Sequence, residues 1–303
     1  MSHLMVILNG KKASNEEIRA AIYQQRDKGQ LLDVRVTWEG GDILRFVDEA
    51  IERSIPRILV GGGDGSLNEA VNALMQYEYN KRPELAILPL GTANDFASSA
   101  NIPQQPEQAL RLALEGRSEA CDLLNMAGRY CLNVISTGFG AEVTRETPVE
   151  LKNFLGGGAY TLMGIAKAAG FQPYPVTLKG ATFTFSGTIL AGVLCNGSQA
   201  GGGQQLAPNA WINDGLMELT LIRHFEPSQL PQVISELSNF PRNGEFIKTF
   251  QCDWVEAKTA GRNIPANFDG ESVNSETETI RIEVVKGAVR LVLPDPCPLI
   301  KPN

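Results

Sequence analysis

The sequence predicts an α/β domain with a mostly parallel sheet, followed by a β-sandwich domain. Residues 4–116 alternate short apolar runs with amphipathic helical stripes, which is the pattern of βαβ units. After about residue 119, strand-like runs bounded by turn residues become frequent. A chain of 303 residues, 43% of them hydrophobic, is long enough to bury a substantial core.

In the first part, short apolar runs predict strands at residues 4–8, 32–36, 57–60 and 85–88. Between them, apolar residues recur at i, i+3, i+4 and i+7 over residues 43–51 and 67–75. Both stripes are predicted to be helices that face the sheet. Alternation of strand and helix in this order is what a parallel sheet requires.

In the second part, strands are predicted at residues 130–135, 182–185, 189–195 and 216–222. Apolar residues also alternate with period two from Ile280 to Val284 and from Val289 to Leu293. One helix is predicted over residues 148–170, and a shorter one after Pro227, because proline is tolerated in a helix's first turn.

The composition excludes several classes of partner. A net charge of −7, with no run of four or more Lys and Arg, argues against nucleic acid and against a polybasic membrane anchor. No apolar stretch reaches the roughly 20 residues of a transmembrane helix, and five scattered cysteines fit reduced thiols. We therefore expect a cytoplasmic protein that contacts a membrane transiently if its substrate is a lipid.

A glycine-rich loop, Gly-Gly-Gly-Asp-Gly-Ser at residues 61–66, joins the third predicted strand to a helix. Glycines let an anion approach the main chain, and the helix end offers free N–H groups. A tight turn alone needs only one or two glycines, so the density favours a phosphate site. The Lys-Ser/Thr pair of a Walker loop is missing, and the next strand ends without the acidic residue of a dinucleotide fold.

Asp64 lies within this predicted phosphate site. A carboxylate there would repel a phosphate unless a divalent cation bridged the two or the carboxylate handled a proton. Mg²⁺ is the simplest solution. The alternative, a helix-capping aspartate, explains the charge but not the glycines.

Two longer motifs carry a resemblance to a known family. Residues 62–69 are GGDGSLNE, and residues 89–97 are PLGTANDFA. The sequence is similar to the diacylglycerol kinase catalytic family, particularly its YegS-type bacterial lipid kinases, in which GGDGT-x-N-E precedes P-x-G-T-x-N-D-F-A. Ser66 replaces the threonine and keeps its hydroxyl. The resemblance extends to Thr37 and to residues 200–203, 213–216 and 269–271, but Asn-Gly-Lys at residues 9–11 departs from it.

The resemblance implies a division of the chain. Residues 1–122, to which residues 294–303 return, would form an α/β domain like that of NAD kinases and phosphofructokinases. Residues 123–293 would form the β-sandwich, with the lipid cleft and the catalytic base. The nucleotide would lie between the two, at Thr37, Gly62, Gly63, Asp64, Gly65, Ser66, Leu67, Asn68, Glu69 and Thr92.

The resemblance also assigns catalytic residues. Alone, Asp269-Gly270-Glu271 is a polar turn. The family makes Glu271 the preferred general base, with Asp269 as second candidate and Asp64 as a further catalytic residue. A base is needed because an alcohol is a poor nucleophile at neutral pH. Thr92 would donate to a phosphate or ribose oxygen, although residues 92–95 also fit a helix cap.

A second metal is implied near Asp214. The family suggests a structural or regulatory cation, Mg²⁺ or another divalent ion such as Ca²⁺, held by Asp214 and the carbonyls of Trp211 and Leu216. Without the family, Asn-Asp-Gly is a turn between strands. The apolar, glycine-rich residues 154–171 fit either a lipid-contacting segment or a buried helix.

The expected function is transfer of the γ-phosphate of ATP, with Mg²⁺, to a hydroxyl of a diacylglycerol-like or phosphatidylglycerol-like lipid, as in phospholipid biosynthesis. The expected partners are ATP and a lipid at a membrane surface. One alternative is an NAD kinase-like or sugar kinase activity, because those relatives share Gly-Gly-Asp-Gly. The other is a non-catalytic nucleotide or lipid sensor, against which the intact Asp64, Asp269 and Glu271 argue.

Overall fold

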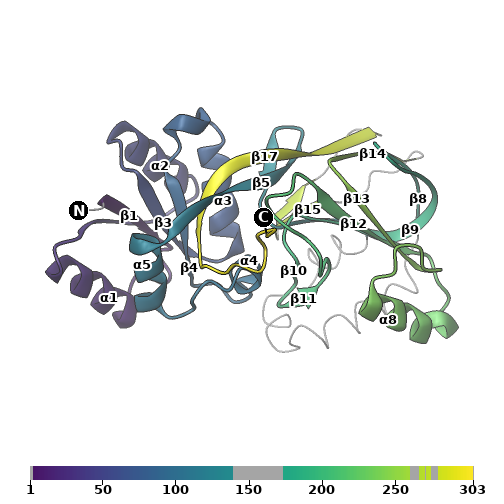
Figure 1. Ribbon diagram of the computed structural model, residues 1–303, viewed down its shortest axis with the longest axis horizontal. Coiled ribbons are helices and arrows are strands. Elements are labelled where there is room, and N and C mark those ends of the chain that lie inside the picture. Colours follow the sequence, from purple (N-terminus) through teal and green to yellow (C-terminus); the bar gives the residue numbers. More distant parts are fainter. Residues whose placement is uncertain (1–2, 139–172, 260–265, 270, 274–278, 303) are drawn as a thin grey trace.

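The computed structural model describes residues 3–138, 173–259, 266–269, 271–273 and 279–302. Figure 1 shows an α/β half, which contains the N-terminus, beside a β-rich half. The helix predicted over residues 148–170 and the apolar residues 154–171 lie outside the described residues.

The α/β half contains the predicted alternation of strands and helices. Its sheet has the order β4-β3-β1-β2, and each neighbouring pair is parallel. The four strands and two helices predicted from the pattern are all present. In chain order the elements are β1 (His3–Leu8), α1 (Glu16–Asp27), β2 (Leu31–Val36), α2 (Asp42–Glu52), β3 (Arg57–Gly62), α3 (Asp64–Leu74), η1 (Tyr79–Lys81), β4 (Glu84–Pro89), α4 (Asp95–Ser99) and α5 (Pro106–Glu115).

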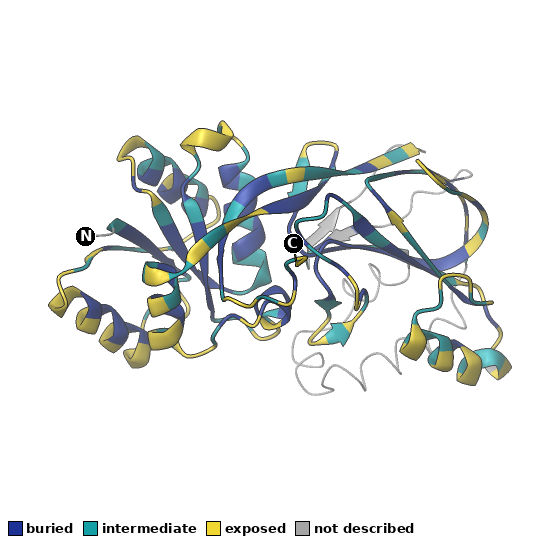
Figure 2. Ribbon diagram, viewed as in Figure 1, coloured by how far each residue is buried: buried dark blue, intermediate teal, exposed yellow. Residues whose placement is uncertain are grey.

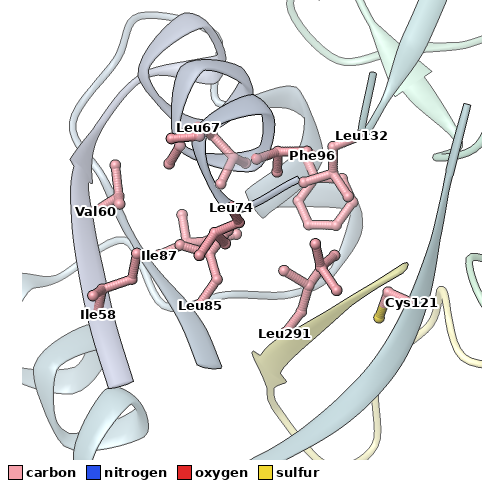
Figure 3. Packing of buried hydrophobic residues seen from close by; sticks show 14 of the residues in the cluster. Ile58, Val60, Leu67, Leu74, Leu85, Ile87, Phe96, Cys121, Leu132 and Leu291 are labelled. Carbon is pink, nitrogen blue, oxygen red and sulfur yellow. The ribbon is translucent and has the colours of Figure 1, made fainter. Parts of the chain in front are cut away.

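Helices cover both faces of this sheet, so its strands are buried on both sides. In β1, Met5 and Ile7 join the core beneath α2 and α3, whereas Leu4, Val6 and Leu8 join the core beneath α1 and α5. Figure 2 shows that the helices expose their outer faces and bury their inner ones. Figure 3 shows α3 packing through Leu67 and Leu74 onto side chains of β3 and β4.

The β-rich half is a β-sandwich of antiparallel strand pairs around a second apolar core. Its helical interruption after Pro227 is present. The elements are β5 (Arg117–Met126), β6 (Arg129–Cys131), β7 (Val134–Gly138), β8 (Tyr174–Gly180), β9 (Thr184–Cys195), β10 (Gln199–Ala200), β11 (Gln204–Gln205), β12 (Met217–Arg223), η2 (Pro227–Gln229), α8 (Leu230–Asn239), β13 (Ile247–Cys252), β14 (Trp254–Thr259), β15 (Ala266–Phe268), β16 (Glu271–Val273) and β17 (Thr279–Leu293).

Strands β5 and β17 run through both halves as a long antiparallel pair (Figure 1). At one end β17 pairs with β14 of the sandwich, and at the other Leu291 pairs in parallel with Leu85 of β4. The alternating runs at residues 280–284 and 289–293 therefore belong to one strand, with a register shift between Val285 and Val289. This pair makes the two sheets continuous.

Two strand boundaries differ from the prediction. Runs 182–185 and 189–195 form the single strand β9, whereas run 130–135 is divided between β6 and β7. The division has a physical cause, because the N–H groups of Leu132 and Asn133 donate to the carboxylate of Asp269 rather than to a neighbouring strand.

The C-terminal residues pack against the α/β half. Leu299 is buried in its core, and its carbonyl accepts the N–H of Ile212 at 2.9 Å. All five cysteines are free thiols. Among the described residues, no helix has both the length and the apolar character needed to cross a membrane.

Candidate active site

The candidate site is a row of loops at the carboxyl ends of β2, β1, β3 and β4. Backbone hydrogen bonds join neighbouring loops: Thr37 donates to Leu8 at 2.9 Å, Asn9 to Gly61 at 2.8 Å, and Leu90 to Gly62 at 2.8 Å. In an open parallel sheet, ligands bind at this edge. The predicted glycine loop, residues 61–66, lies at the centre of the row.

Packing disfavours a side chain at two glycines of this loop and at Gly91 of the loop after β4. A Cβ on Gly62 would lie 2.5 Å from the Cβ of Ser66, and one on Gly61 would lie 2.7 Å from a Leu8 methyl carbon. A Cβ on Gly91 would lie 2.5 Å from the Cα of Gly63, so the loops after β3 and β4 touch backbone to backbone. Packing therefore explains part of the high number of glycines, which in the sequence favours a phosphate site.

Gly65 is different, because a Cβ there would meet no atom within 4 Å. It also lacks a positive φ, so the backbone does not require glycine either. Helix α3 begins at Asp64, and its N-cap, Gly63, offers no side-chain hydrogen bond to the helix end. The first N–H groups of a helix then stay available to an anion. Gly65 keeps this approach open.

Asp64 turns its carboxylate toward α4. Its two oxygens accept the N–H groups of Asp95 and Phe96, both at 3.3 Å. Helix α4 therefore receives its cap from the glycine loop. The alternative of a cap within residues 92–95 is wrong, since the N-cap residue Asn94 makes no side-chain cap bond. Asn94 instead exchanges two hydrogen bonds with Gly91.

Asp95 connects the two halves of the protein. It is buried, and its carboxylate accepts the N–H groups of Gly202 at 3.0 Å and Gly203 at 2.6 Å. Both glycines have positive φ, which lets successive N–H groups converge on one anion. Figure 1 shows α4 beside β10 at this contact.

Asp269 approaches the same place from the β-rich half. Its carboxylate accepts three backbone N–H groups, from Leu132 at 3.2 Å, Asn133 at 3.3 Å and Val134 at 2.8 Å. Burial nevertheless raises the pKa of Asp269 to about 6, and the charge of Asp64 adds to the rise. The pKa of Asp64 is raised by burial and then by the charge of Asp95. Asp64, Asp95 and Asp269 thus lie in one region of the protein, although no three acidic, histidine or cysteine side chains of the described residues converge on one point.

The other predicted residues have different surroundings. Glu271 begins β16, in register with Phe268 of β15, but its side chain lies outside the described residues. Leu67 and Asn68 lie on the buried face of α3, and Asn68 accepts hydrogen bonds from Asn72 of the same helix.

Two hydroxyl residues belong to other loops of the row: Thr92 follows β4, next to the glycine loop, and Thr37 follows β2, two strands from β3. The Oγ1 atom of Thr37 accepts the N–H of Gly10 at 3.2 Å. Thr92 is exposed, and Ser66 and Glu69 of α3 are half-buried. Ser66 and Thr92 thus lie near the open start of α3, whereas Thr37 lies farther along the same edge of the sheet.

Asp214 occupies a second acidic position. Its side chain is 4% exposed, and its Oδ1 accepts the N–H of Leu216 at 3.0 Å. Its Oδ2 has no hydrogen-bond partner, and Lys301 Nζ lies 3.8 Å away. Lys301 also lies over the ring of Trp211. A buried carboxylate oxygen with no donor fits a hard cation, although no three Asp, Glu, His or Cys residues of the described chain converge on one point.

Sequence reasoning missed two neighbours of Asp214. Asp122 is buried and accepts the N–H groups of Gly215 and Gly287, each at 2.7 Å. Burial and the charge of Asp214 raise the pKa of Glu218 to about 7. Neither acid belongs to a recognisable motif. Their only sequence signal was an acidic residue within an otherwise apolar strand run.

Comparisons with known proteins agree with this architecture. Residues 3–126 match the diacylglycerol kinase catalytic domain, and residues 133–293 match the YegS C-terminal NAD kinase β-sandwich-like domain. The chain belongs to the YegS-type lipid kinase family. This confirms the family and the fold class predicted from the sequence.

Two bacterial relatives are each named probable lipid kinase YegS-like. One, from Shewanella frigidimarina, is 47% identical over 301 residues, which is 99% of this chain and 96% of the relative. The other, from Chromohalobacter salexigens, is 46% identical over 291 residues, 96% and 93% of the two chains. A crystal structure of a diacylglycerol kinase from Bacillus anthracis has a TM-score of 0.75 over 97% of each chain at 20% identity, which shows the shared fold.

Substitution Gly65→Ala separates phosphate binding from folding. Because the new Cβ would meet no protein atom, we expect the free energy of unfolding to stay the same or rise by up to about 1 kcal/mol. Affinity for ADP with Mg²⁺ should fall about tenfold or more, because the methyl group occupies the approach to the helix end. Urea unfolding and calorimetric titration measure the two quantities.

The matched control is Gly62→Ala, whose Cβ would clash with Ser66 and should destabilise the protein. An unchanged ADP affinity in Gly65→Ala would place the phosphates elsewhere.

Asp269 should make stability depend on pH. Its folded-state pKa of about 6 lies above the usual 3.8, so the stability that its proton contributes is complete below about pH 4 and is lost as pH rises through 6. The loss should amount to at most about 3 kcal/mol. Urea unfolding between pH 4 and 7 should show this slope in the wild type and a flatter one in Asp269→Asn. Equal slopes would contradict it.

Proposed function

We propose that this chain is an ATP-dependent kinase that transfers the γ-phosphate to a hydroxyl of a lipid, diacylglycerol-like or phosphatidylglycerol-like. The observation that carries the proposal is the open start of α3 at Asp64, whose carboxylate accepts the N–H of Asp95, the residue that joins the two halves through Gly202. Membership of a lipid kinase family and relatives named as lipid kinases support the lipid as acceptor.

The α/β half would bind the nucleotide. The N–H groups at the start of α3 would hold phosphate oxygens, with the hydroxyls of Ser66 and Thr92 as further donors, and Thr37 would contact the nucleotide farther from the phosphates. The γ-phosphate would then lie near Asp64, on the side of the site that faces Asp269. This arrangement uses backbone dipoles rather than basic side chains, in keeping with a net charge of −7.

Asp64 would hold the Mg²⁺ that accompanies ATP. Its pKa is raised by burial and by Asp95, which indicates negative charge that nearby groups do not offset. Bound Mg²⁺ would supply neutralisation of phosphate charge during transfer. The long 3.3 Å bonds from α4 leave the carboxylate oxygens free to accept a further ligand.

We assign the general base to Glu271 rather than to Asp269. Both oxygens of Asp269 already accept backbone N–H groups, an arrangement that fixes Asp269 against the segment between β6 and β7. Glu271 would take the proton of the lipid hydroxyl while the oxygen of that hydroxyl bonds to the γ-phosphorus. The bond from the γ-phosphorus to the β–γ bridging oxygen would break, and ADP would leave. Asp269 would therefore position the residue that removes the proton.

The lipid would enter from the β-rich half, at the surface of a membrane that the protein contacts transiently from the cytoplasm. The alternatives are an NAD kinase-like or sugar kinase activity and a sensor without turnover. The kinase activities differ in the acceptor of the phosphate, and the sensor has none, so identifying the acceptor decides among them.

Acceptor specificity tests the proposal directly. Purified protein, γ-labelled ATP and Mg²⁺ should transfer label to diacylglycerol or phosphatidylglycerol in mixed micelles, and not to NAD or sugars. Thin-layer chromatography identifies the labelled product. Label only in NAD or a sugar would refute the lipid assignment, and transfer to no acceptor would favour a sensor.

The matched variant for this assay is Glu271→Gln, which should lower turnover by about 10²- to 10⁴-fold. ADP affinity should persist, because the nucleotide binds to the other half. Turnover near that of the wild type would remove Glu271 as base.

We further propose that Asp214, with the carbonyls of Trp211 and Leu216, holds a second divalent cation, Mg²⁺ or Ca²⁺. Nucleotide-free protein is first treated with a chelator, which is then removed. Adding Mg²⁺ or Ca²⁺ should raise its melting temperature, because the ion binds only the folded chain. The shift should disappear in Asp214→Asn and persist in Asp64→Asn. An equal shift in Asp214→Asn would place the cation elsewhere.

A further inference from the structure

Trp38, the residue after Thr37, is exposed to an unusual degree. Its relative exposure of 93% is the highest among the large hydrophobic residues of the described chain. An indole ring gains free energy when its apolar faces leave water, so a ring held fully in solvent forgoes that gain. Such a ring on a ligand-binding edge suggests that a ligand covers it.

The loop that carries this ring is held in one conformation. The N–H groups of Trp38 and Glu39 donate to Asp42 Oδ2 at 2.6 and 3.1 Å, and Arg45 binds the other oxygen of Asp42 at 2.6 Å. These hydrogen bonds lower the pKa of Asp42 to about 2, so it stays ionised at neutral pH. The indole is therefore exposed although the backbone that carries it is fixed by hydrogen bonds.

Trp38 belongs to the same row of loops as the glycine loop. Thr37 is tied to the end of β1 through Leu8 and Gly10, and the next residue of that loop, Asn9, is tied to Gly61 of β3. In the sheet order β4-β3-β1-β2, the end of β2 is two strand spacings from β3, roughly 10 Å. A ribose and base extend from a phosphate by a comparable length.

The site also has a direction. The reacting end of the nucleotide must face Asp269 and the β-rich half, which adjoins the sheet on the β4 side through β17. With the phosphates at the end of β3, the nucleoside can only extend the other way, over β1 toward β2. That path ends at Thr37 and Trp38.

From this geometry we propose that the indole of Trp38 stacks on the adenine of bound ATP and so contributes to nucleotide affinity. The inference rests on the proposed use of ATP and adds the residue that binds the base. Stacking on an aromatic ring improves affinity by about 5- to 100-fold per base and is tolerant of base identity. The ring acts in binding and takes no part in phosphoryl transfer.

The experiment compares wild type, Trp38→Ala and Trp38→Phe as full chains. In Trp38→Ala, affinity for ADP with Mg²⁺ and the KM for ATP should each worsen by about 5- to 100-fold, while kcat changes less than about twofold. Affinity for inorganic tripolyphosphate, which has no base, should not change. Trp38→Phe should recover most of the affinity, because it restores an aromatic face.

Three results would overturn the inference. The first is an unchanged ADP affinity in Trp38→Ala. The second is an equal loss for tripolyphosphate, which would mean that the loop and not stacking was changed. The third is lost binding to phosphatidylglycerol vesicles with ADP affinity intact, which would assign the ring to the membrane.

Failure of the underlying function is distinguishable from these results. A wild-type protein that neither binds ADP nor transfers phosphate contradicts the ATP-dependent kinase itself. An active wild type with an unaffected Trp38→Ala variant contradicts the stacking alone.

Discussion

Near the junction of the two halves, loops are fixed by carboxylates that accept backbone N–H groups from another segment of the chain. Asp64 caps α4, Asp95 binds the glycines before β11, Asp269 binds the segment between β6 and β7, and Asp122 binds two loops near Asp214. The N–H groups of the buried residues Phe96, Leu132 and Asn133 would otherwise have no partner. The loops in this region therefore depend on ionised carboxylates for their backbone hydrogen bonds.

This construction has an electrostatic consequence. Burial raises the pKa values of Asp64, Asp122 and Asp269, so the ionised carboxylates are less favourable here than in water. A cation that accompanied a nucleotide would relieve that unfavourable energy on binding.

Local patterns were sufficient for much of the site. Strand, glycine loop and helix follow one another in the chain, so residues 57–74 and their likeness to a lipid kinase family could be predicted. Partners far apart in sequence could not. Nothing near Asp95 indicates that it binds Gly202, and nothing near Asp269 indicates that it interrupts the strand predicted over residues 130–135.

The sequence by itself determined the alternation of β and α, the open helix start after Gly63 and the family, because each depends on neighbours within a few residues. Only the tertiary structure decided that Gly91 must be glycine to pass Gly63, that Asp64 caps a different helix, and that the exposed Trp38 shares an edge with the phosphate loop. The close approach of Gly91 to Gly63, the cap on α4 and the position of Trp38 on the same edge as the glycine loop depend on contacts between the ends of different strands. The order of residues along the chain does not specify those contacts.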